Sequence, residues 1–225
     1  NVMSHEIINT ITPISSLAEN LNSLLQDTPD QETLAELSQG LSIIKRRSHH
    51  LTSFVEKYRT LAELPLPEKE LADISEIIQN TLDLFQSEFK ENQVDVVFSP
   101  SEKVLLSVDK KQIEQVFINL ITNSLYSFSE TTRPTITVLL KKQSNRIIVS
   151  FSDNGNGIPK NIRGNIFIPY FTTRKDGSGI GLTLTKSILE SHDGMIHLKP
   201  SEVGCLFHLS FPEPKESERL HDNKP

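Results

Sequence analysis

Two short stretches rich in glycine carry the residue types best suited to hold a nucleotide. Residues 153–159 contain Asp-x-Gly-x-Gly at the end of an alternating strand, and residues 175–182 contain Gly-x-Gly-x-Gly at the start of an expected helix. The Asp153 carboxylate could accept a hydrogen bond from an exocyclic amine, and glycine lets a flat ring approach the backbone. Taken alone, the first pattern favours a tight turn over a nucleotide contact.

The second glycine stretch has the composition of a phosphate site. Arg174 and Lys175 come shortly before its glycines, and the N–H groups and positive end of the following helix suit phosphate. The pattern lacks the Gly-Lys-Ser/Thr of a P-loop and the directly preceding strand of a Rossmann fingerprint. The sequence therefore predicts a phosphate site of another kind.

Two asparagines share one face of an expected helix. Asn119 and Asn123 are four residues apart in a helix predicted near 109–128, for which Asp109 is a suitable N-cap. Neutral amide oxygens can ligate Mg²⁺ without the negative charge that would repel phosphates. Two ordinary surface asparagines are the alternative, although asparagine is a mediocre helix former and two on one face of an apolar helix are unusual.

The helix expected near the start of the sequence exposes a histidine. His5 lies about 200° around the helix axis from Ile7 of the apolar seam, so it faces solvent. A neutral imidazole nitrogen is a nucleophile near neutral pH, and the adjacent Glu6 could orient or accept its other proton. Asn9 continues the polar stripe, and Pro13 could bend the helix. An exposed histidine without function is the more common alternative for a lone residue.

Heptad spacing of apolar residues predicts two long helices over residues 3–27 and 31–63. The polar turn at 27–30 would join them as an antiparallel hairpin. Such a hairpin cannot enclose a core by itself, whereas pairing with a second copy would give a four-helix bundle. The pattern therefore predicts a homodimer.

The two prolines within residues 64–70 end this hairpin, and a mixed α and β pattern follows. Helices are expected near 73–90, 109–128 and 180–192. Strands are expected near 94–99, 104–108, 135–142, 147–153, 195–199 and 205–211. Two of these strands, 135–142 and 147–152, would form a β-hairpin. The charged segment after Pro212 is expected to be disordered.

Charge and composition exclude several classes of function. The net charge of −6 argues against general nucleic-acid binding, and no apolar run reaches the roughly 18 residues of a membrane span. The single cysteine, Cys205, excludes an internal disulfide and is expected to be a buried thiol. The opening residues indicate a fragment of a longer protein.

The histidines expected at surface or strand positions are His49, His50, His192, His197, His208 and His221.

Together and in this order, these stretches closely resemble the catalytic core of sensor histidine kinases of two-component signalling, from His5 to about Phe211. His5 and Glu6, with Asn9, resemble the phosphoacceptor box. The other matching boxes are the N box (Asn119, Asn123), the first glycine box (Asp153, Gly155, Gly157), the F box (Phe167, Phe171) and the second glycine box (Gly177, Gly179, Gly181). Any one box is weak, but four in order behind a helical hairpin are highly specific.

The resemblance implies an α+β protein. An N-terminal helical hairpin would form a four-helix bundle in a dimer, followed by a two-layer α/β sandwich with the Bergerat-type ATP-binding fold of topoisomerase and chaperone ATPases. The expected parts are a dimerisation and histidine phosphotransfer hairpin at 1–64, a linker at 65–70, a catalytic ATP-binding domain at 71–213 and a polar tail at 214–225.

The resemblance also implies ATP and Mg²⁺ as cofactors. Asn119 would hold Mg²⁺, Asn123 would contact phosphate and Asp153 would bind the adenine amino group. Residues 156–178 would form a mobile lid. The remaining expected ATP contacts are Gly155, Gly157, Ile158, Phe167, Phe171, Thr173, Arg174, Lys175, Gly177, Ser178, Gly179, Ile180, Gly181 and Leu182.

In the implied reaction, the γ-phosphoryl group passes to His5 as Glu6 activates the imidazole, and a response-regulator aspartate then takes it. Asn9 would position water for the reverse, phosphatase reaction. The implied partners are a second copy of the chain and a response-regulator receiver domain, with no direct nucleic-acid binding. The catalytic portion would be cytoplasmic, with any anchorage in a bacterial inner membrane through an upstream region.

The sequence departs from the family pattern at several positions. Many members carry a lysine and then an aromatic residue where this sequence has Tyr126 and Ser127, so more of the phosphate contact falls on Arg174 and Lys175. Gln115 stands where ATPase relatives place a water-activating glutamate, which disfavours simple ATP hydrolysis. A GHKL-fold ATPase and a degenerate dimeric signalling scaffold are the alternatives.

Overall fold

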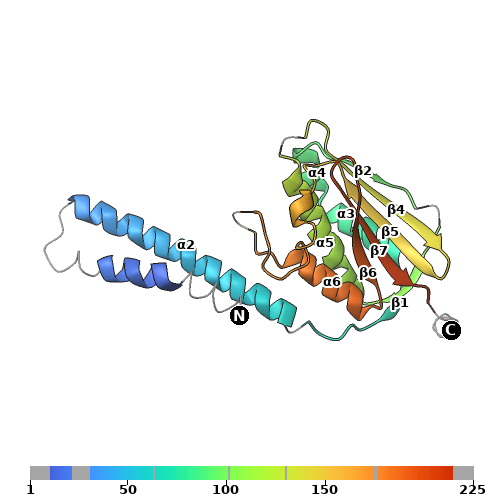
Figure 1. The fold of residues 1–225 in the computed structure, drawn as a ribbon, viewed down its shortest axis with the longest axis horizontal. Helices are drawn as coiled ribbons and strands as arrows, with labels where there is room; N and C mark the ends of the chain where they lie inside the picture. The colour runs from blue at the N-terminus through green and yellow to red at the C-terminus, as the bar shows by residue number, and fades with distance from the viewer. Residues whose placement is uncertain are drawn as a thin grey trace. The chain divides into compact units, whose positions relative to one another are not determined.

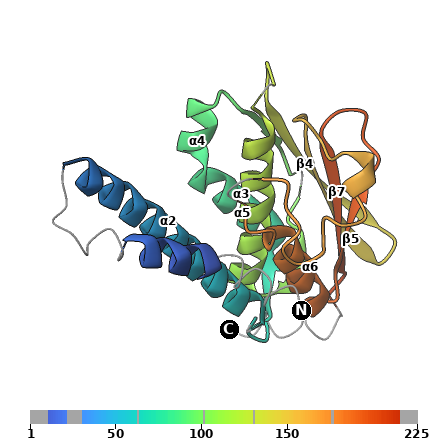
Figure 2. The same cartoon turned by 60° about the vertical axis from the view of Figure 1, so that its left-hand side comes forward.

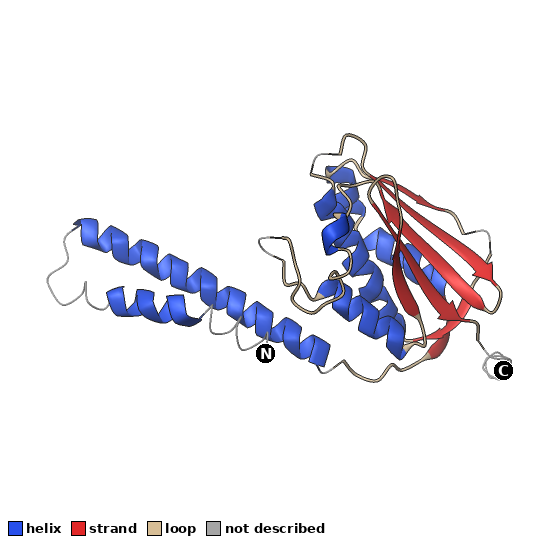
Figure 3. Ribbon diagram, viewed as in Figure 1, coloured by secondary structure: helices blue, strands red, loops and turns tan. Residues whose placement is uncertain are grey.

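The structure is a computed structural model that describes residues 11–21, 31–62, 64–100, 102–129, 131–174 and 177–214. The chain divides into two compact units, Asn1–Glu63 and Leu64–Pro225. The described part of the first unit is helical, and the second unit combines helices with strands (Figures 1 and 3). Within the described ranges, no helix is both long enough and apolar enough to cross a membrane.

In the first unit, residues 11–21 form a helix that runs beside α2, Gln31–Ala62 (Figures 1 and 2). Leu21 is buried and packs against Gly40 of α2, and Leu37 is buried as well. Both leucines belong to the apolar heptad seam. The predicted helical hairpin is therefore confirmed over the described residues, and the predicted connecting turn lies outside them.

The second unit is built on a five-stranded sheet with the strand order β2-β4-β5-β7-β6. β2 runs parallel to β4, and the other neighbouring pairs are antiparallel. A separate two-stranded sheet pairs β1 with β3 in the antiparallel direction. The strands are β1 Glu70–Asp73, β2 Asp95–Phe98, β3 Leu105–Val108, β4 Thr135–Gln143, β5 Arg146–Asp153, β6 Met195–Lys199 and β7 Cys205–Pro212.

Helices α3, α5 and α6 lie against one face of the large sheet and form the second layer of an α/β sandwich (Figures 1 and 3). The core between the layers follows from the two periodicities: β5 buries Ile147, Val149 and Phe151, and α5 buries Phe117 and Ile121. The expected two-layer α+β fold is confirmed. The helical elements are α3 Ile74–Leu84, α4 Gln86–Glu91, α5 Lys110–Ser127, the 3-10 helix η1 Lys160–Ile162 and α6 Gly181–Ser191.

Two elements near the start of the second unit differ from those expected. The single helix expected near 73–90 is divided into α3 and α4 at Phe85, whose φ and ψ are −100° and 10°. Asp73 caps α3, because its carboxylate accepts a hydrogen bond from Ser75 N at 2.9 Å. The sequence does not predict β1, because its four residues show no clear alternation and pair with a strand far along the chain.

β4 and β5 form the predicted hairpin around a two-residue loop, Ser144–Asn145. Ser144 has a φ of 54°, in the left-handed region that tight hairpin turns require. Both loop residues are exposed. The hairpin carries Asp153 at the far end of β5 from this loop.

His192 is buried, contrary to the surface or strand position expected for it. Its Nε2 accepts a hydrogen bond from Asp109 N at 3.0 Å, so Nδ1 carries the proton and donates to Ile188 O at 2.7 Å. His192 thereby ties the end of α6 to the beginning of α5. Desolvation lowers the pKa of His192 and favours this neutral form.

Cys205 is the buried thiol that its apolar surroundings predict. It begins β7, which lies next to β5 in the sheet. Burial raises the pKa of Cys205 to about 12, with a smaller contribution from the nearby Asp153 carboxylate. At neutral pH the side chain is therefore a thiol and not a reactive thiolate.

Candidate functional site

Asp153 is the last residue of β5, and its side chain is buried. Burial raises the pKa of this carboxyl group, and the hydrogen bonds that the carboxylate accepts oppose the shift. The donors are Gly155 N at 3.0 Å, Cys205 N at 3.3 Å and Ser127 Oγ at 3.4 Å to Oδ1, and Ser124 Oγ at 3.2 Å to Oδ2. Oδ2 therefore keeps the capacity to accept a hydrogen bond from a ligand.

Gly155 allows the turn after β5 to pass close to the end of α5. A Cβ atom at this position would overlap Ser127 Oγ and would lie 2.7 Å from Ser127 Cβ. Asn156 N donates a hydrogen bond to Ser127 O at 3.0 Å, which fastens the turn to the helix. The first glycine of the pattern is thus required by contact with α5, beyond any need for a flexible turn.

Asn119 links α5 to the first turn of α6. Its Nδ2 donates hydrogen bonds to Gly181 O at 3.1 Å and to Thr185 Oγ1 at 3.3 Å. Its Oδ1 accepts a hydrogen bond from Gln115 Nε2 at 3.2 Å. The structure therefore brings the last glycine of the second stretch beside the first asparagine of the N box.

Asn123 lies one helical turn further along α5 and contacts a cation. Arg174 Nη1 donates a hydrogen bond to Asn123 Oδ1 at 3.3 Å. The Arg174 guanidinium carbon also lies 3.9 Å from the centroid of the Tyr126 ring. The positive charge predicted to lie near phosphate is therefore held against α5 from the segment before the second glycine stretch.

The second glycine stretch turns the chain into α6. Tyr170 N donates a hydrogen bond to Gly179 O at 2.9 Å, and a Cβ atom on Gly179 would overlap the Tyr170 carbonyl carbon. Gly179 has a φ of 64°, which residues with a side chain rarely adopt. Ile180, which precedes α6, makes no side-chain cap, so the N–H groups of the first turn can serve an anion.

One stretch of α5 connects these two groups of side chains. Asn119 and Asn123 contact the start of α6 and Arg174, whereas Ser124 and Ser127 contact Asp153. The helix rises about 12 Å between positions 119 and 127. A carboxylate thus lies at one end of the candidate site, and amides with a cation lie at the other.

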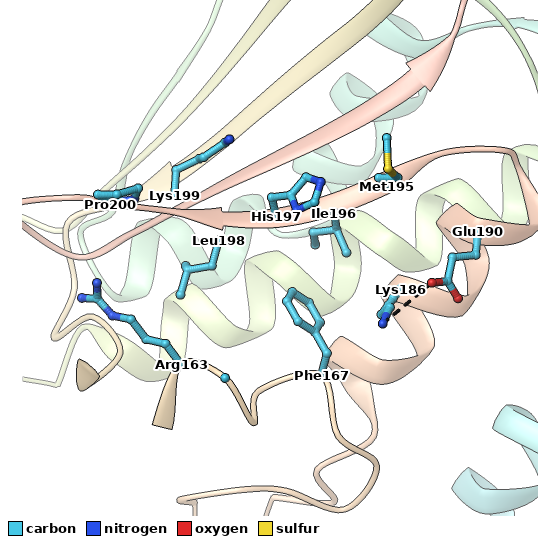
Figure 4. A pocket seen from close by; sticks show the side chains of 11 residues that line it. Arg163, Phe167, Lys186, Glu190, Met195, Ile196, His197, Leu198, Lys199 and Pro200 are labelled. Atoms are coloured by element: carbon cyan, nitrogen blue, oxygen red, sulfur yellow. Dashed lines mark ion pairs between the residues drawn. The ribbon is translucent and has the colours of Figure 1, made fainter. Parts of the chain in front are cut away.

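Phe167 does not join this group. Its side chain projects into a cavity of about 600 Å³ between α6 and β6, as Figure 4 shows. Lys186 and Glu190 of α6 line this cavity and form an ion pair at 3.8 Å, whereas the preceding Thr185 contacts Asn119. The cavity and the asparagines therefore lie on different faces of α6.

The other expected ATP contacts lie on the two glycine stretches and on the segment between them. In its described part, the expected lid at 156–178 consists of turns and η1. Ile180 is buried, Thr173 is exposed, and the partly buried positions are Gly157, Ile158, Phe171, Gly177, Ser178, Gly181 and Leu182. His5, Glu6, Asn9 and Lys175 lie outside the described residues.

The sequence did not identify the hydroxyl groups that hold the site residues. Ser124 and Ser127 bind Asp153, and Thr185 binds Asn119. Ser124 and Ser127 are three residues apart and share one helix face, which is a signal that the sequence offers. Thr185 has no such local signal, since its partner is 66 residues away.

The donor set of the site suits a magnesium ion that is bound mainly by phosphate and water. Within the described residues, no cluster of three or more His, Cys, Asp or Glu side chains could hold a metal ion. At the end of the site that suits phosphate, the amide oxygens of Asn119 and Asn123 are hard ligands on described residues. Mg²⁺ commonly takes one or two protein oxygens and completes its octahedron with phosphate and water.

Comparison with known proteins agrees with this geometry. Residues 108–215 match the family described as "Histidine kinase-, DNA gyrase B-, and HSP90-like ATPase". These residues form a GHKL-type histidine kinase domain. Such a kinase domain uses ATP.

Relatives extend the similarity to nearly the whole chain. The chain is 29% identical over 93% of its length to the sensor histidine kinase ZraS of Salmonella typhi, and 29% identical over 90% to the nitrogen regulation protein NtrY of Azorhizobium caulinodans. It spans only 44% and 26% of the length of these two proteins.

Solved structures resemble both the GHKL domain and the longer chain. The catalytic domain of histidine kinase ThkA is 27% identical with a TM-score of 0.60, covering 65% of this chain and 96% of that one. The structure of ThkA in complex with the response regulator protein TrrA is 25% identical with a TM-score of 0.68, covering 94% of this chain and 60% of that one.

Proposed function

We propose that this chain is the phosphotransfer and catalytic core of a sensor histidine kinase. It transfers the γ-phosphoryl group of ATP to His5 and then to an aspartate of a response regulator, and it also dephosphorylates that regulator. The observation that supports this most is the arrangement of Asp153, the two asparagines and Arg174 along α5 in a GHKL domain.

The carboxylate end of the site would hold adenine. Asp153 Oδ2 would accept a hydrogen bond from the adenine amino group, because Oδ1 is occupied by three protein donors. Burial of the carboxylate strengthens such a bond, since little water competes for it. Gly155 and Gly157 would let the ring lie close to the backbone.

The amide end would hold the phosphates. Asn123, Arg174 and the first turn of α6 would contact phosphate oxygens, with Lys175 as a further cation. Mg²⁺, held through Asn119, would neutralise phosphate charge during transfer. The bonds from Asn119 Nδ2 to Gly181 and Thr185 fix the amide, so its oxygen has a defined orientation.

In the proposed transfer, an imidazole nitrogen of His5 attacks the γ-phosphorus. The N–P bond forms as the bond to the leaving oxygen of ADP breaks, and Glu6 orients the imidazole and accepts its proton. A regulator aspartate then takes the phosphoryl group from the histidine. Asn9 would position the water that later removes it from the regulator.

A simple ATPase is the main alternative, and the neighbour of Asn119 counts against it. Gln115 stands where an ATPase would place its water-activating glutamate, and its amide donates a hydrogen bond to Asn119 Oδ1 at 3.2 Å. A neutral amide cannot take a proton from water. The nucleotide would therefore persist until a better nucleophile, such as His5, attacks it.

The hairpin would form a homodimer. Ile11, Leu34 and Leu41 belong to the apolar seam, yet their exposed fractions in the single chain are 44%, 54% and 60%. A second hairpin would cover such side chains in a four-helix bundle. The proposed partner of the dimer is a receiver domain of a response regulator. The similarity to ThkA, whose structure was solved in complex with the response regulator protein TrrA, supports this proposal.

The proposed cellular place of the catalytic portion is the cytoplasm. Anchorage to a bacterial inner membrane would depend on other parts of a longer protein, because the chain spans less than half of ZraS. Direct binding to nucleic acid is not part of the proposal, since the net charge is −6.

Incubation with radiolabelled Mg-ATP tests the assignment. The wild-type chain should gain a phosphate that is labile in acid and stable in base, and His5→Gln should lose it while still binding ATP. His49→Gln, a change to a histidine of α2, is the matched control and should keep the label. Labelling that persists in His5→Gln would show that the phosphoacceptor is another residue.

A further inference from the structure

Tyr126 and Arg174 are far apart in the sequence and meet at the end of α5. The Arg174 guanidinium carbon lies 3.9 Å from the centroid of the Tyr126 ring. Tyr126 is 55% exposed, so its ring contributes little to the core. At this distance the ring face attracts the cation, and this cation–π contact stabilises the exposed Tyr126 ring beside Arg174.

The contacts of Arg174 orient its charge without neutralising it. Besides the Tyr126 ring, the guanidinium donates a hydrogen bond to the neutral Asn123 Oδ1. Among the residues that the structure describes, no carboxylate forms an ion pair with Arg174. Its Nε is buried and has no hydrogen-bond partner there. The positive charge is therefore left for an anion, and among the described residues only Asn123 Oδ1 takes one of the five guanidinium N–H donors.

We infer that Tyr126 is a positioning residue that holds Arg174 at the phosphate end of the ATP site. Here the helix supplies an aromatic platform, and the cation comes from the segment before the second glycine stretch. A planar guanidinium can stack on a ring and still present its edge to a phosphate, which an ammonium group cannot do.

This inference rests on the proposed ATP site and is tested by coupling between the two residues. The affinity of the chain for Mg-AMPPNP, measured by calorimetry, should fall about 2- to 5-fold in Tyr126→Ala, the range expected for an exposed cation–π contact. Arg174→Ala should weaken binding about tenfold, because a charge-assisted contact to phosphate is lost. The double variant should bind no more weakly than Arg174→Ala alone.

Conservative variants and a ligand without phosphate separate positioning from a structural role. Tyr126→Phe keeps the ring and should bind Mg-AMPPNP like the wild type. Adenosine, which engages only the carboxylate end, should bind equally to all variants. Leu139→Ala changes an exposed side chain of β4 and is the control for nonspecific effects.

Three results would overturn the inference. They are additive losses in the double variant, a Tyr126→Phe variant as weak as Tyr126→Ala, and an equal loss of adenosine binding. If the wild-type chain itself binds neither Mg-AMPPNP nor adenosine, the proposed function fails and the inference fails with it.

Discussion

Asp153 and Asn119 lie at the two ends of the candidate site along α5, and their surroundings differ. Asp153 has an exposed fraction of 8% and is held by donors from α5, β7 and its own turn. Asn119 is half-buried, and its partners come from α5 and from the start of α6. The carboxylate end is therefore fixed jointly by the sheet and α5, whereas the amide end depends on how α6 and the segment before it are placed.

This difference explains which parts of the site the sequence could predict. The Asp153 turn follows an alternating strand, and the asparagines lie on one face of a periodic helix, so local pattern marks both as candidates. Only the boxes taken together and in order favour a nucleotide site over a plain turn and surface asparagines. The contact of Tyr126 with Arg174 joins residues on separate elements. Nothing in local periodicity reports such a contact, because only the packed fold brings the two side chains together.

The secondary-structure elements that the sequence predicted depend on local pattern, whereas those it missed depend on contacts between residues distant in the sequence. The hairpin of β4 and β5 is local and carries its own turn, so its alternation predicted it. Strand β1 exists through pairing with β3, which is distant in the sequence. The absence of metal-ligand spacing around His192 predicts a surface or strand position for it, whereas here Asp109 N and Ile188 O satisfy both ring nitrogens.

The largest effect on nucleotide binding is expected from Asp153→Asn at the carboxylate end of the site. The variant replaces a carboxylate oxygen with an NH₂ group that faces donors, so ATP binding should weaken about 100-fold or more. Calorimetry with adenosine and with Mg-ATP checks this, and the dimer should survive in ultracentrifugation. Asp95→Asn, at an exposed position of β2, is the matched control. Unchanged adenosine affinity in Asp153→Asn would remove the adenine role.

An intermediate effect on nucleotide binding is expected from Asn119→Ala at the amide end of the site. Loss of the bonds to Gly181 and Thr185 should lower the free energy of unfolding by about 1–2 kcal/mol. Mg-ATP binding should weaken about tenfold while adenosine binding stays unchanged, since the carboxylate end is held separately.

Thr185→Val is the control for that variant, because it removes only the bond at 3.3 Å and leaves the amide in place. The decrease in the free energy of unfolding that Thr185→Val causes, measured with urea, should be about half of that caused by Asn119→Ala. If Asn119→Ala weakened the binding of adenosine as much as that of Mg-ATP, the carboxylate end and the amide end of the site would not be independent.

The smallest effect is expected on the pH dependence of stability, through His192, which ties the end of α6 to the beginning of α5. Because the pKa of His192 is lowered in the folded chain, the unfolded chain binds a proton first as pH falls below about 6.5. The free energy of unfolding should therefore decrease from about pH 7 to about pH 5.5, by at most about 1.4 kcal/mol per pH unit from this group. Urea unfolding at several pH values measures it.

His192→Gln removes the titrating ring and should flatten this part of the pH dependence. An amide can still accept from Asp109 N, so the loss of stability at neutral pH should be modest. His197→Gln, at an exposed position of β6, is the matched control. An equal slope in His192→Gln and the wild type would assign the pH dependence to other groups.

The loop Ser144–Asn145 has a practical consequence for such measurements. It lies at the far end of β5 from Asp153, about 24 Å along the strand. Asn145→Cys would place an accessible thiol there, while the native Cys205 stays buried with a pKa of about 12 and so forms almost no thiolate. A single fluorescent dye could therefore be attached at this loop without removing the native cysteine and without touching the nucleotide site.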